Sequence, residues 1–217
     1  FFGFDTSYLR DPFPTDIDII NKKIQPFFCR TTKKELQVPD VNPDIISRIK
    51  VTANEQKLFE IIAKKYQKNK LALFIRMLQM ESNPKMLLQK IDLKDFSSVL
   101  DLQTDINLID FVDYANEVKT LIEDIGITSK KKECLSLTEK LVNENKKVVI
   151  WCIFVDSIRS IKASLESMGI KAECIMGEVA LEDRIALTNA FKDGKYDVLI
   201  TNPHTLAESV SLHHVCH

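Results

Sequence analysis

Glycine and tryptophan are scarce in this sequence, with five glycines and one tryptophan among 217 residues. No glycine-rich turn follows the first apolar run of its β-α pattern, as a Rossmann-type nucleotide-binding or transferase domain would require. The single tryptophan, Trp151, lies inside an apolar run and is predicted to pack in the core. A free-standing Rossmann-type enzyme is therefore the least favoured interpretation.

The sequence also lacks an excess of charge of either sign, because it contains 30 basic and 31 acidic side chains. A free-standing nucleic-acid binder usually has a strongly basic footprint, so any DNA contact is expected to be local. Long apolar runs are missing too, since stretches such as 71–78 and 148–155 are far shorter than the roughly 20 residues of a membrane-spanning helix. We expect a folded protein that is not embedded in a membrane.

The five cysteines show no disulfide framework, because they are odd in number, widely spaced and mostly set in apolar runs. This usage is typical of reduced thiols and predicts a cytoplasmic protein. The first residues, FFGFDTSYLRDPFP, include no initiator methionine and no charged start of a signal peptide, so we expect a piece of a longer chain. The abundance of lysine, isoleucine and asparagine suggests a bacterial or viral source.

The first half of the sequence has mainly helical patterns. Apolar residues at intervals of three or four predict a helix over 15–28 with Thr15 as N-cap, and a second helix with Asn54 as N-cap. Between them, two prolines interrupt residues 37–43, and the alternating run 46–51 predicts a strand.

Further helices are expected up to Asn145. One covers LALFIRMLQM and is stopped by Asn83-Pro84, and two more are expected at 109–124 and 130–145. The predicted inner face of the last helix consists of Leu135, Leu137, Leu141 and Val142.

From Lys147 onward the pattern changes to short apolar runs, each followed by an amphipathic segment. The runs at 148–153, 171–175 and 197–201 predict buried parallel strands that alternate with helices. The helix after the first strand should end at Met168-Gly169, with glycine in the C-terminal cap. Folds of this kind bind ligands in the loops at the carboxyl ends of their strands.

Two of these loops contain candidate site residues. After the second strand, Gly177 makes a turn and Arg184 projects from the following helix, where an arginine is usually only solvated. After the third strand, TNPHTLAESVSL is rich in the hydroxyl side chains that commonly hold nucleic-acid phosphates. A basic track near the N-terminus could contact DNA or could simply be solvated. It consists of Lys22, Lys23, Arg30, Lys33 and Lys34.

The order of these segments resembles the second motor lobe of Swi/Snf-type helicase-like ATPases of superfamily two, over nearly the whole chain. Arg30 and Lys33 stand at the family's Arg-x-x-Lys signature, ahead of a proline, a strand and a Gln-bearing helix. LALFIRMLQMESNPKML is similar to the family's helix that ends in Asn-Pro-Lys-Leu. VVIWCIFVDSI resembles the fourth helicase motif and TNPHTLAESVSL the fifth, where residues 208–212 replace a glycine-rich Glu-Gly-Leu-Asn-Leu.

The resemblance implies roles for individual residues. The residues implied in DNA binding are Thr201, Thr205, Glu208, Ser209, Arg30 and Lys33. Those implied at the nucleotide cleft or the lobe interface are Gly177, Arg184 and Ser211. Because glycine lets a backbone approach DNA or nucleotide more closely than serine does, the serines of the fifth-motif loop depart from the family pattern.

The resemblance also implies that several motor parts lie outside these 217 residues. The phosphate-binding loop and the Mg²⁺-holding acidic motif are missing, and the sixth motif with its arginine finger is expected beyond His217. Phosphoryl transfer needs a lysine, Mg²⁺ and an arginine around the γ-phosphate. The chain is therefore expected to have no catalytic residue, to meet ATP and Mg²⁺ only together with the first lobe, and to be inactive alone. The parent protein is expected to be a DNA-dependent ATPase.

The predicted fold class is α/β, with a RecA-like parallel sheet and flanking helices preceded by a mainly helical segment, as a fragment of a two-lobe motor. Residues 1–45 would connect to the first motor lobe, 46–128 would form a protrusion-like helical part, and 129–217 a RecA-like lobe truncated after the fifth motif. Expected partners are double-stranded DNA and the first RecA-like lobe.

One alternative function stays open, a non-catalytic protein-interaction module on a RecA-like scaffold, because fold does not fix function. No metal is predicted, since the C-terminal His213, His214, Cys216 and His217 fit no standard zinc spacing. Glu182 and Asp183 are adjacent on a helix and point in different directions, so they make a poor acid/base pair.

Overall fold

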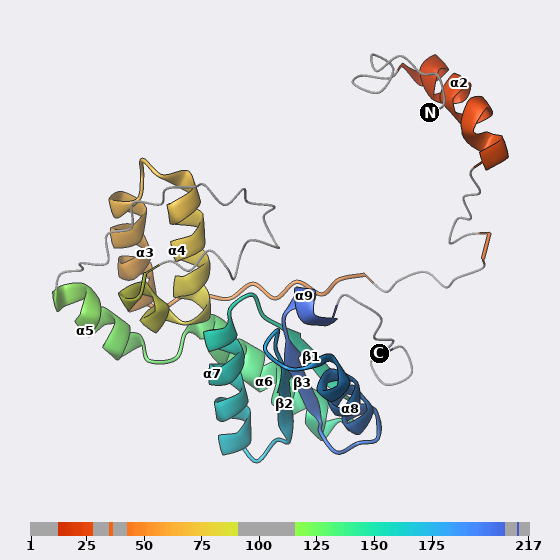
Figure 1. Cartoon of the computed structure of the whole chain (residues 1–217). Helices are drawn as coiled ribbons and strands as arrows, with labels where there is room; N and C mark the ends of the chain where they lie inside the picture. The colour runs from red at the N-terminus through yellow and green to blue at the C-terminus, as the bar shows by residue number, and fades with distance from the viewer. Residues whose placement is uncertain (1–12, 28–34, 37–42, 91–115, 207–211, 213–217) are drawn as a thin grey trace. The chain divides into compact units, whose positions relative to one another are not determined.

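The computed structural model describes residues 13–27, 35–36, 43–90, 116–206 and 212 (Figure 1). The chain separates into two compact units, Phe1–Ser47 and Arg48–His217. The division predicted from the sequence, with boundaries after residues 45 and 128, stays a prediction.

The described part of the first unit contains helix α2 (Pro14–Ile24) and the 3₁₀ turn η1 (Gln25–Phe27). The N-cap is Phe13 rather than the predicted Thr15, because Pro14 occupies the first helical position, where its missing N–H costs nothing. The carboxylate of Asp16 accepts a hydrogen bond from the Phe13 amide at 3.0 Å. No residue of α2 is buried.

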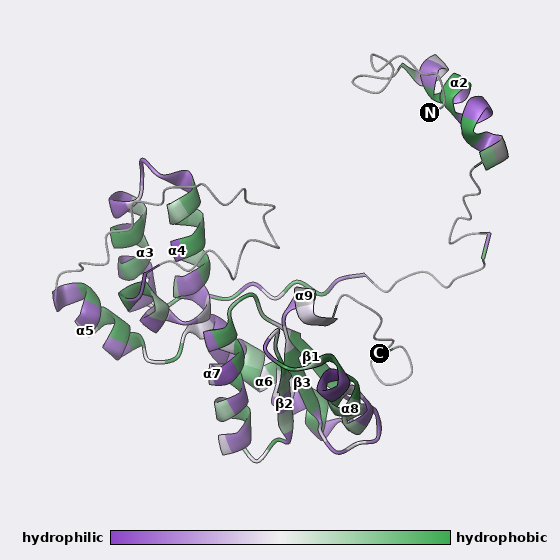
Figure 2. Ribbon diagram, viewed as in Figure 1, coloured by the Kyte–Doolittle hydropathy of each residue, from purple (hydrophilic) through white to green (hydrophobic). Residues whose placement is uncertain are grey.

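The first part of the second unit is helical, as predicted. Helices α3 (Ala53–Lys65), α4 (Lys70–Ser82) and α5 (Asn116–Ile125) and the 3₁₀ segment η2 (Pro84–Leu88) share a core that includes Leu58, Ile62 and Ile122. Figure 2 shows apolar and polar residues alternating along α3 and α4, as expected for amphipathic helices. Residues 109–115 of the predicted helix 109–124 lie outside the described residues.

The cap of α3 differs from the prediction. Thr52, not Asn54, is the N-cap, and its hydroxyl accepts a hydrogen bond from the Glu55 amide at 3.3 Å. The Glu55 carboxylate in turn accepts one from the Thr52 amide at 2.7 Å, which completes a capping box. The predicted end of α4 is confirmed, because the helix stops at Ser82 before Asn83-Pro84.

The strand predicted at 46–51 is absent. These residues have no regular secondary structure, and Ile46 and Val51 are 81% and 55% exposed. An alternating run forms a strand only where another strand completes its hydrogen-bond ladder, and none of the described residues pairs with this segment.

The rest of the second unit alternates strands and helices. Its elements are α6 (Ser129–Asn143), β1 (Val148–Trp151), α7 (Val155–Ser167), β2 (Ala172–Ile175), α8 (Leu181–Lys192), β3 (Val198–Thr201) and the short α9 (Pro203–Leu206). The three strands are parallel in the order β1-β3-β2, and Figure 1 shows α7 and α8 on opposite sides of the sheet. The predicted α/β class with a parallel sheet is confirmed.

Each face of the sheet has its own core. Ile158, Ile161 and Leu165 of α7 and Leu135 of α6 pack on one face, and Phe191 of α8 packs on the other. Leu137 was predicted to face inward but is 46% exposed. Thr138 is buried in its place, and its hydroxyl donates to the Cys134 carbonyl at 2.7 Å, which lets a polar side chain face the core.

The turn between α7 and β2 confirms the predicted glycine cap. Gly169 has a φ of +79°, a conformation that favours glycine. Its amide donates to the Glu166 carbonyl and the Ile170 amide to the Leu165 carbonyl, both at 3.0 Å. This is a Schellman ending, and it turns the chain directly into β2.

The helical part and the sheet part of the second unit are joined by buried contacts. Ile75 of α4, Met86 of η2 and Phe154 at the start of α7 form one apolar cluster. The hydroxyl of Thr128 donates to the Glu81 carbonyl at 2.9 Å. The end of α4 is thereby fixed against the start of α6.

Among the described helices, none combines the length and the apolar character needed to cross a bilayer. The predicted cytoplasmic location stays a prediction.

Candidate functional site

The carboxyl ends of the three strands meet at one edge of the sheet. Trp151 of β1 and Ile175 of β2 are both in register with Thr201 of β3, so the three following loops start at the same level. In open parallel sheets this edge is where ligands bind. Most of the predicted site residues of the second unit follow these strand ends.

The loop after β3 uses its hydroxyl groups internally. Thr201 is fully buried, and its hydroxyl donates to the Ile175 carbonyl at 2.8 Å. Thr205 is 8% exposed, and both its amide and its hydroxyl donate to the side-chain oxygen of Asn202. The hydroxyls of Thr201 and Thr205 thus face the protein, and the predicted contact of these two residues with DNA stays a prediction.

The loop after β2 is held by hydrogen bonds from the Arg184 side chain. Its Nε donates to the Val179 carbonyl at 2.7 Å, and a terminal guanidinium nitrogen donates to the Gly177 carbonyl at 2.8 Å. The helix position suggested that the Arg184 side chain is only solvated, but the side chain forms two hydrogen bonds with the protein. Gly177 lies in an exposed turn, as predicted. The seven-residue spacing between Gly177 and Arg184 lets the guanidinium reach the Gly177 carbonyl. A role of either residue at a nucleotide cleft stays a prediction.

The loop after β1 contradicts one expectation. Trp151 is 53% exposed, although its position in an apolar run predicted core packing. Apolar character alone does not reveal that β1 is the outer strand of the described sheet and that its last residue stands beside an open cavity. Trp151 is consequently available for contact with another molecule.

The three described cysteines, Cys134, Cys152 and Cys174, are free thiols. Burial raises the pKa of Cys152 to about 12 and that of Cys174 to about 11. Burial also raises the pKa of Cys134. These thiols are poor nucleophiles at neutral pH, since the thiolate is the reactive form.

Several predicted site residues lie outside the described residues. They are Arg30, Lys33, Glu208, Ser209, Ser211 and the C-terminal His213, His214, Cys216 and His217. Their proposed contacts with DNA, nucleotide or zinc stay predictions.

A basic groove was missed by the sequence interpretation. It is lined by Arg48 and Lys50 of the segment before α3 and by Lys132 of α6, with Glu133 as the acidic residue among them. The groove brings together cations from two distant segments, so no local sequence pattern reveals it. Cations gathered in this way are suited to hold a phosphate backbone.

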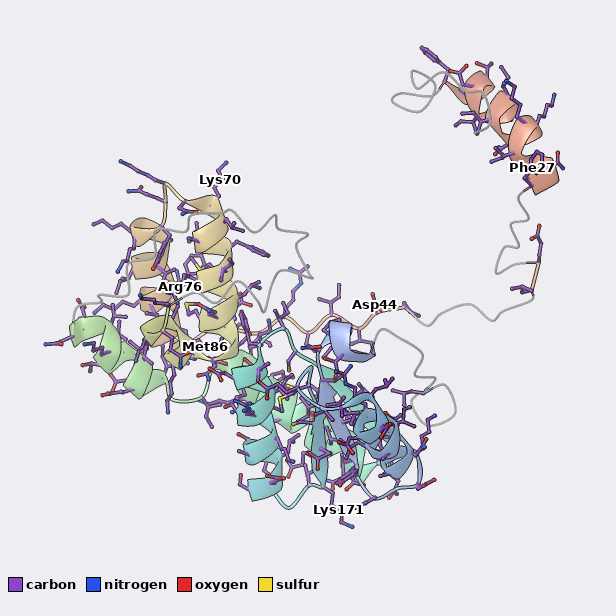
Figure 3. All side chains as sticks on the ribbon, viewed as in Figure 1. Phe27, Asp44, Lys70, Arg76, Met86 and Lys171 are labelled. Atoms are coloured by element: carbon purple, nitrogen blue, oxygen red, sulfur yellow. The ribbon has the colours of Figure 1, made fainter. Side chains whose placement is uncertain are left out.

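Two buried charged residues were also missed. Arg76 is fully buried, and its guanidinium donates to the side chain of Gln79 at 2.8 Å and to the carbonyls of Met86 and Gln89 at 3.2 and 2.9 Å. Figure 3 labels Arg76 and Met86 at this contact in the helical part. Arg76 thus holds η2 and the residue after it against α4. Nothing in the sequence pattern around Arg76 signals its burial.

The second missed residue is Glu55, which is 5% exposed. Its carboxylate accepts hydrogen bonds from the Ser129 amide at 2.7 Å and from the Ser129 hydroxyl at 2.6 Å. Burial alone would raise its pKa, but the hydrogen bonds from Ser129 and Thr52 lower the pKa below the ordinary value of 4.5. The Thr-x-x-Glu spacing at Thr52 is a capping-box signal that could have identified it.

Within the described ranges, no group of three or more His, Cys, Asp or Glu side chains is placed to hold a metal ion. Arg184, which the resemblance implies at the nucleotide cleft, donates hydrogen bonds to the loop before its own helix. A role of Arg184 in binding ATP together with a first lobe stays a prediction.

Comparison with known proteins agrees with this geometry. Residues 129–217 match the family model of the helicase conserved C-terminal domain. The sequence matches none of the curated proteins with which it was compared.

The structure is similar to three solved ones. The helicase domain of Hef from Pyrococcus furiosus superposes with a TM-score of 0.52 at 12% identity, over 89% of this chain and 54% of that one. The C-terminal part of the Fun30 ATPase domain gives 0.48 at 14% identity, over 78% and 70%. The SWI2/SNF2 ATPase core domain of Sulfolobus solfataricus gives 0.45 at 13% identity, over 91% and 38%.

This chain spans about half the length of the Hef helicase-domain structure. The likeness to Hef at 12% identity concerns the fold, whereas the family match concerns the sequence of residues 129–217. The structural likeness to Hef and the family match agree with the parallel sheet and with the resemblance to a helicase motor lobe found in the sequence. Residues 129–217 are thus similar in sequence to the helicase conserved C-terminal domain, and their parallel sheet with flanking helices has the RecA-like α/β fold.

Proposed function

We propose that this chain is the second motor lobe of an ATP-dependent translocase that moves on double-stranded DNA and belongs to the Swi/Snf type. The proposal builds on the helicase C-terminal domain at 129–217 and on the sequence segments before it that resemble the same motor lobe. In this function the lobe contributes contacts with the DNA backbone and one side of a cleft between two lobes.

The observation that carries the DNA contact is the basic groove of Arg48, Lys50 and Lys132. Phosphate contacts are electrostatic and independent of sequence, which suits a motor that must hold any stretch of duplex. In this proposal the groove provides phosphate contacts in place of those predicted for Thr201 and Thr205, whose side chains are buried. A net charge of −1 also requires that DNA binding be concentrated in such a local patch.

ATP and Mg²⁺ enter this proposal only together with a first RecA-like lobe, because phosphoryl transfer needs a phosphate-binding lysine and bound Mg²⁺, which the resemblance assigns to that lobe. Gly177, Arg184 and Ser211 would then lie at the lobe interface. Closing and opening of the cleft would shift the grip of this lobe on the DNA.

The DNA contact is tested by fluorescence anisotropy of a labelled duplex at several salt concentrations. The variant Arg48→Gln/Lys50→Gln/Lys132→Gln should weaken binding and lower the slope of log affinity against log salt by about 3, since each phosphate contact contributes about 0.9. The matched control Lys64→Gln/Lys68→Gln/Lys119→Gln removes the same charge from exposed positions elsewhere and should change the slope by less than 1. Equal slopes in the two variants would remove the groove from the proposal.

The motor function is tested by ATP hydrolysis of the full-length gene product in which this sequence occurs, with and without duplex DNA. Strong stimulation by duplex supports a translocase, and the 217-residue chain alone should be silent. An ATPase rate that is indifferent to duplex contradicts the proposal.

A second function is favoured by one observation. Two predicted DNA contacts, Thr201 and Thr205, are buried, which is what a RecA-like scaffold without DNA contacts would show. In that function the chain is a non-catalytic protein-interaction module. It is preferred if the groove variant leaves DNA affinity unchanged and the full-length protein has no DNA-dependent ATPase activity.

A further inference from the structure

A cavity of about 190 Å³ opens between α4, α6, α7 and the end of β1. Apolar walls come from Leu78, Ile150 and Ile161, and Trp151 lines it while 53% of its surface stays exposed. An apolar cavity of ~150 Å³ is known to hold a benzene ring. This cavity is therefore large enough for a small ring compound.

One buried hydroxyl in the wall has no partner. Ser157 lines the cavity, is 3% exposed, and its Oγ forms no hydrogen bond with any described residue. Buried polar groups in folded proteins are nearly always hydrogen-bonded, and each exception needs an explanation. An acceptor or donor on a bound molecule would supply the missing partner.

The cavity wall also contains a cation without a counter-charge. The ammonium of Lys131 donates to the carbonyl and the hydroxyl of Ser160 at 2.9 and 2.6 Å, which uses two of its three N–H groups. It forms no ion pair with a described carboxylate, whereas its neighbour Lys130 pairs with Glu81 at 3.0 Å. Burial lowers the pKa of Lys131, so the charged form lacks compensation in its present surroundings.

We propose that this cavity binds a small organic anion that carries a flat apolar ring. The ring packs between Leu78, Ile150 and Ile161 and against the indole of Trp151. The anionic group accepts hydrogen bonds from the Ser157 hydroxyl and the remaining N–H of Lys131. An aromatic carboxylate has this combination of ring and charge, and the site does not depend on DNA or on a motor function.

The proposal is tested by titrating the full 217-residue chain with benzoate. Trp151 is the only tryptophan, so its fluorescence reports the cavity alone. Benzoate should change the emission saturably, at lower concentration than benzyl alcohol, which lacks the charge, and acetate, which lacks the ring. The absence of a saturable change overturns the proposal and leaves water as the occupant of the cavity.

Single variants identify the groups that hold the anion. Ser157→Ala and Lys131→Met should each weaken benzoate binding about tenfold, the usual loss for one hydrogen bond to a charged group. The control Lys140→Met removes a charge from an exposed position of α6 that does not line the cavity and should change the affinity by less than threefold. Ser157→Ala removes an unpaired hydroxyl, so its thermal midpoint without ligand should not fall. Equal affinities in Ser157→Ala, Lys131→Met and the unmodified chain would overturn the proposal.

Discussion

The carboxylate of Glu55 at the start of α3 holds both the amide and the hydroxyl of Ser129 at the start of α6, 74 residues later. The same carboxylate accepts the amide and the hydroxyl of Thr52, at 2.7 and 2.9 Å. One side chain thus caps two helices, one in the helical part and one in the segment that matches the helicase C-terminal family model. Together with the cluster of Ile75, Met86 and Phe154, it ties these parts of the second unit.

Removing this carboxylate should destabilise the chain measurably. Glu55→Gln keeps the volume but replaces an acceptor oxygen by an amide that faces donors, and we expect it to lower the free energy of unfolding by about 2 kcal/mol. The control Glu60→Gln, on the exposed face of α3, should stay within about 0.5 kcal/mol. Urea denaturation followed by circular dichroism measures both, and equal losses would show that Glu55 has no special role.

The same residue predicts a pH dependence. The pKa of Glu55 is lower in the folded chain than its ordinary value of 4.5. Its contribution to stability is therefore fully present above pH 4.5 and is lost as the pH falls through the folded-state pKa. The stability difference between the unmodified chain and Glu55→Gln should be constant at neutral pH and narrow below pH 4.5. A difference that widens in acid would contradict the sign of this shift.

Arg184 should control the order of the loop after β2. Arg184→Ala removes two hydrogen bonds to the Val179 and Gly177 carbonyls, and we expect a loss of about 1–2 kcal/mol with faster hydrogen exchange in residues 176–180. Arg159→Ala is the matched control, because Arg159 reaches the same loop through Glu178 at 3.4 Å in an exposed ion pair. Such pairs contribute little, so its exchange pattern should stay unchanged.

Replacing Thr201 should lower the free energy of unfolding and leave the affinity for DNA unchanged. Thr201→Val preserves the shape but leaves the Ile175 carbonyl without its donor, and we expect a loss of about 1–2 kcal/mol. The exposed Thr120→Val serves as the control and should have little effect. Duplex affinity, measured by anisotropy, should change by less than twofold in both. A tenfold loss of DNA affinity in a stable Thr201→Val chain would restore the sequence-based role.

The thiols of half-buried Cys152 and buried Cys174 should resist alkylation in the native chain. With a pKa of about 12 for Cys152 and about 11 for Cys174, very little thiolate exists at pH 8. We expect iodoacetamide to label both residues at least about a hundredfold more slowly than in urea. Mass spectrometry of the digested protein distinguishes the individual cysteines, and rapid native labelling of Cys174 would show that its strand opens.

The sequence alone determined the α/β class and the strands β1, β2 and β3, because short continuous apolar runs that alternate with amphipathic segments are typical of a parallel sheet covered by helices. It also determined local stops, such as the end of α4 before Pro84 and the glycine cap at Gly169, since proline and glycine act on their own backbone. The resemblance to a helicase motor lobe likewise came from the order of motifs along the chain.

The tertiary structure decided which side chains are exposed to solvent and which are buried. Thr201 is buried and Trp151 is exposed although the two are in register, because one belongs to the central strand and the other to the outer strand of the described sheet. The run at 46–51 has strand character but no strand beside it, so the prediction failed. The meeting of Glu55 with Ser129, and of Arg48 and Lys50 with Lys132, depends on contacts between distant segments, and a local pattern of residues does not encode such contacts.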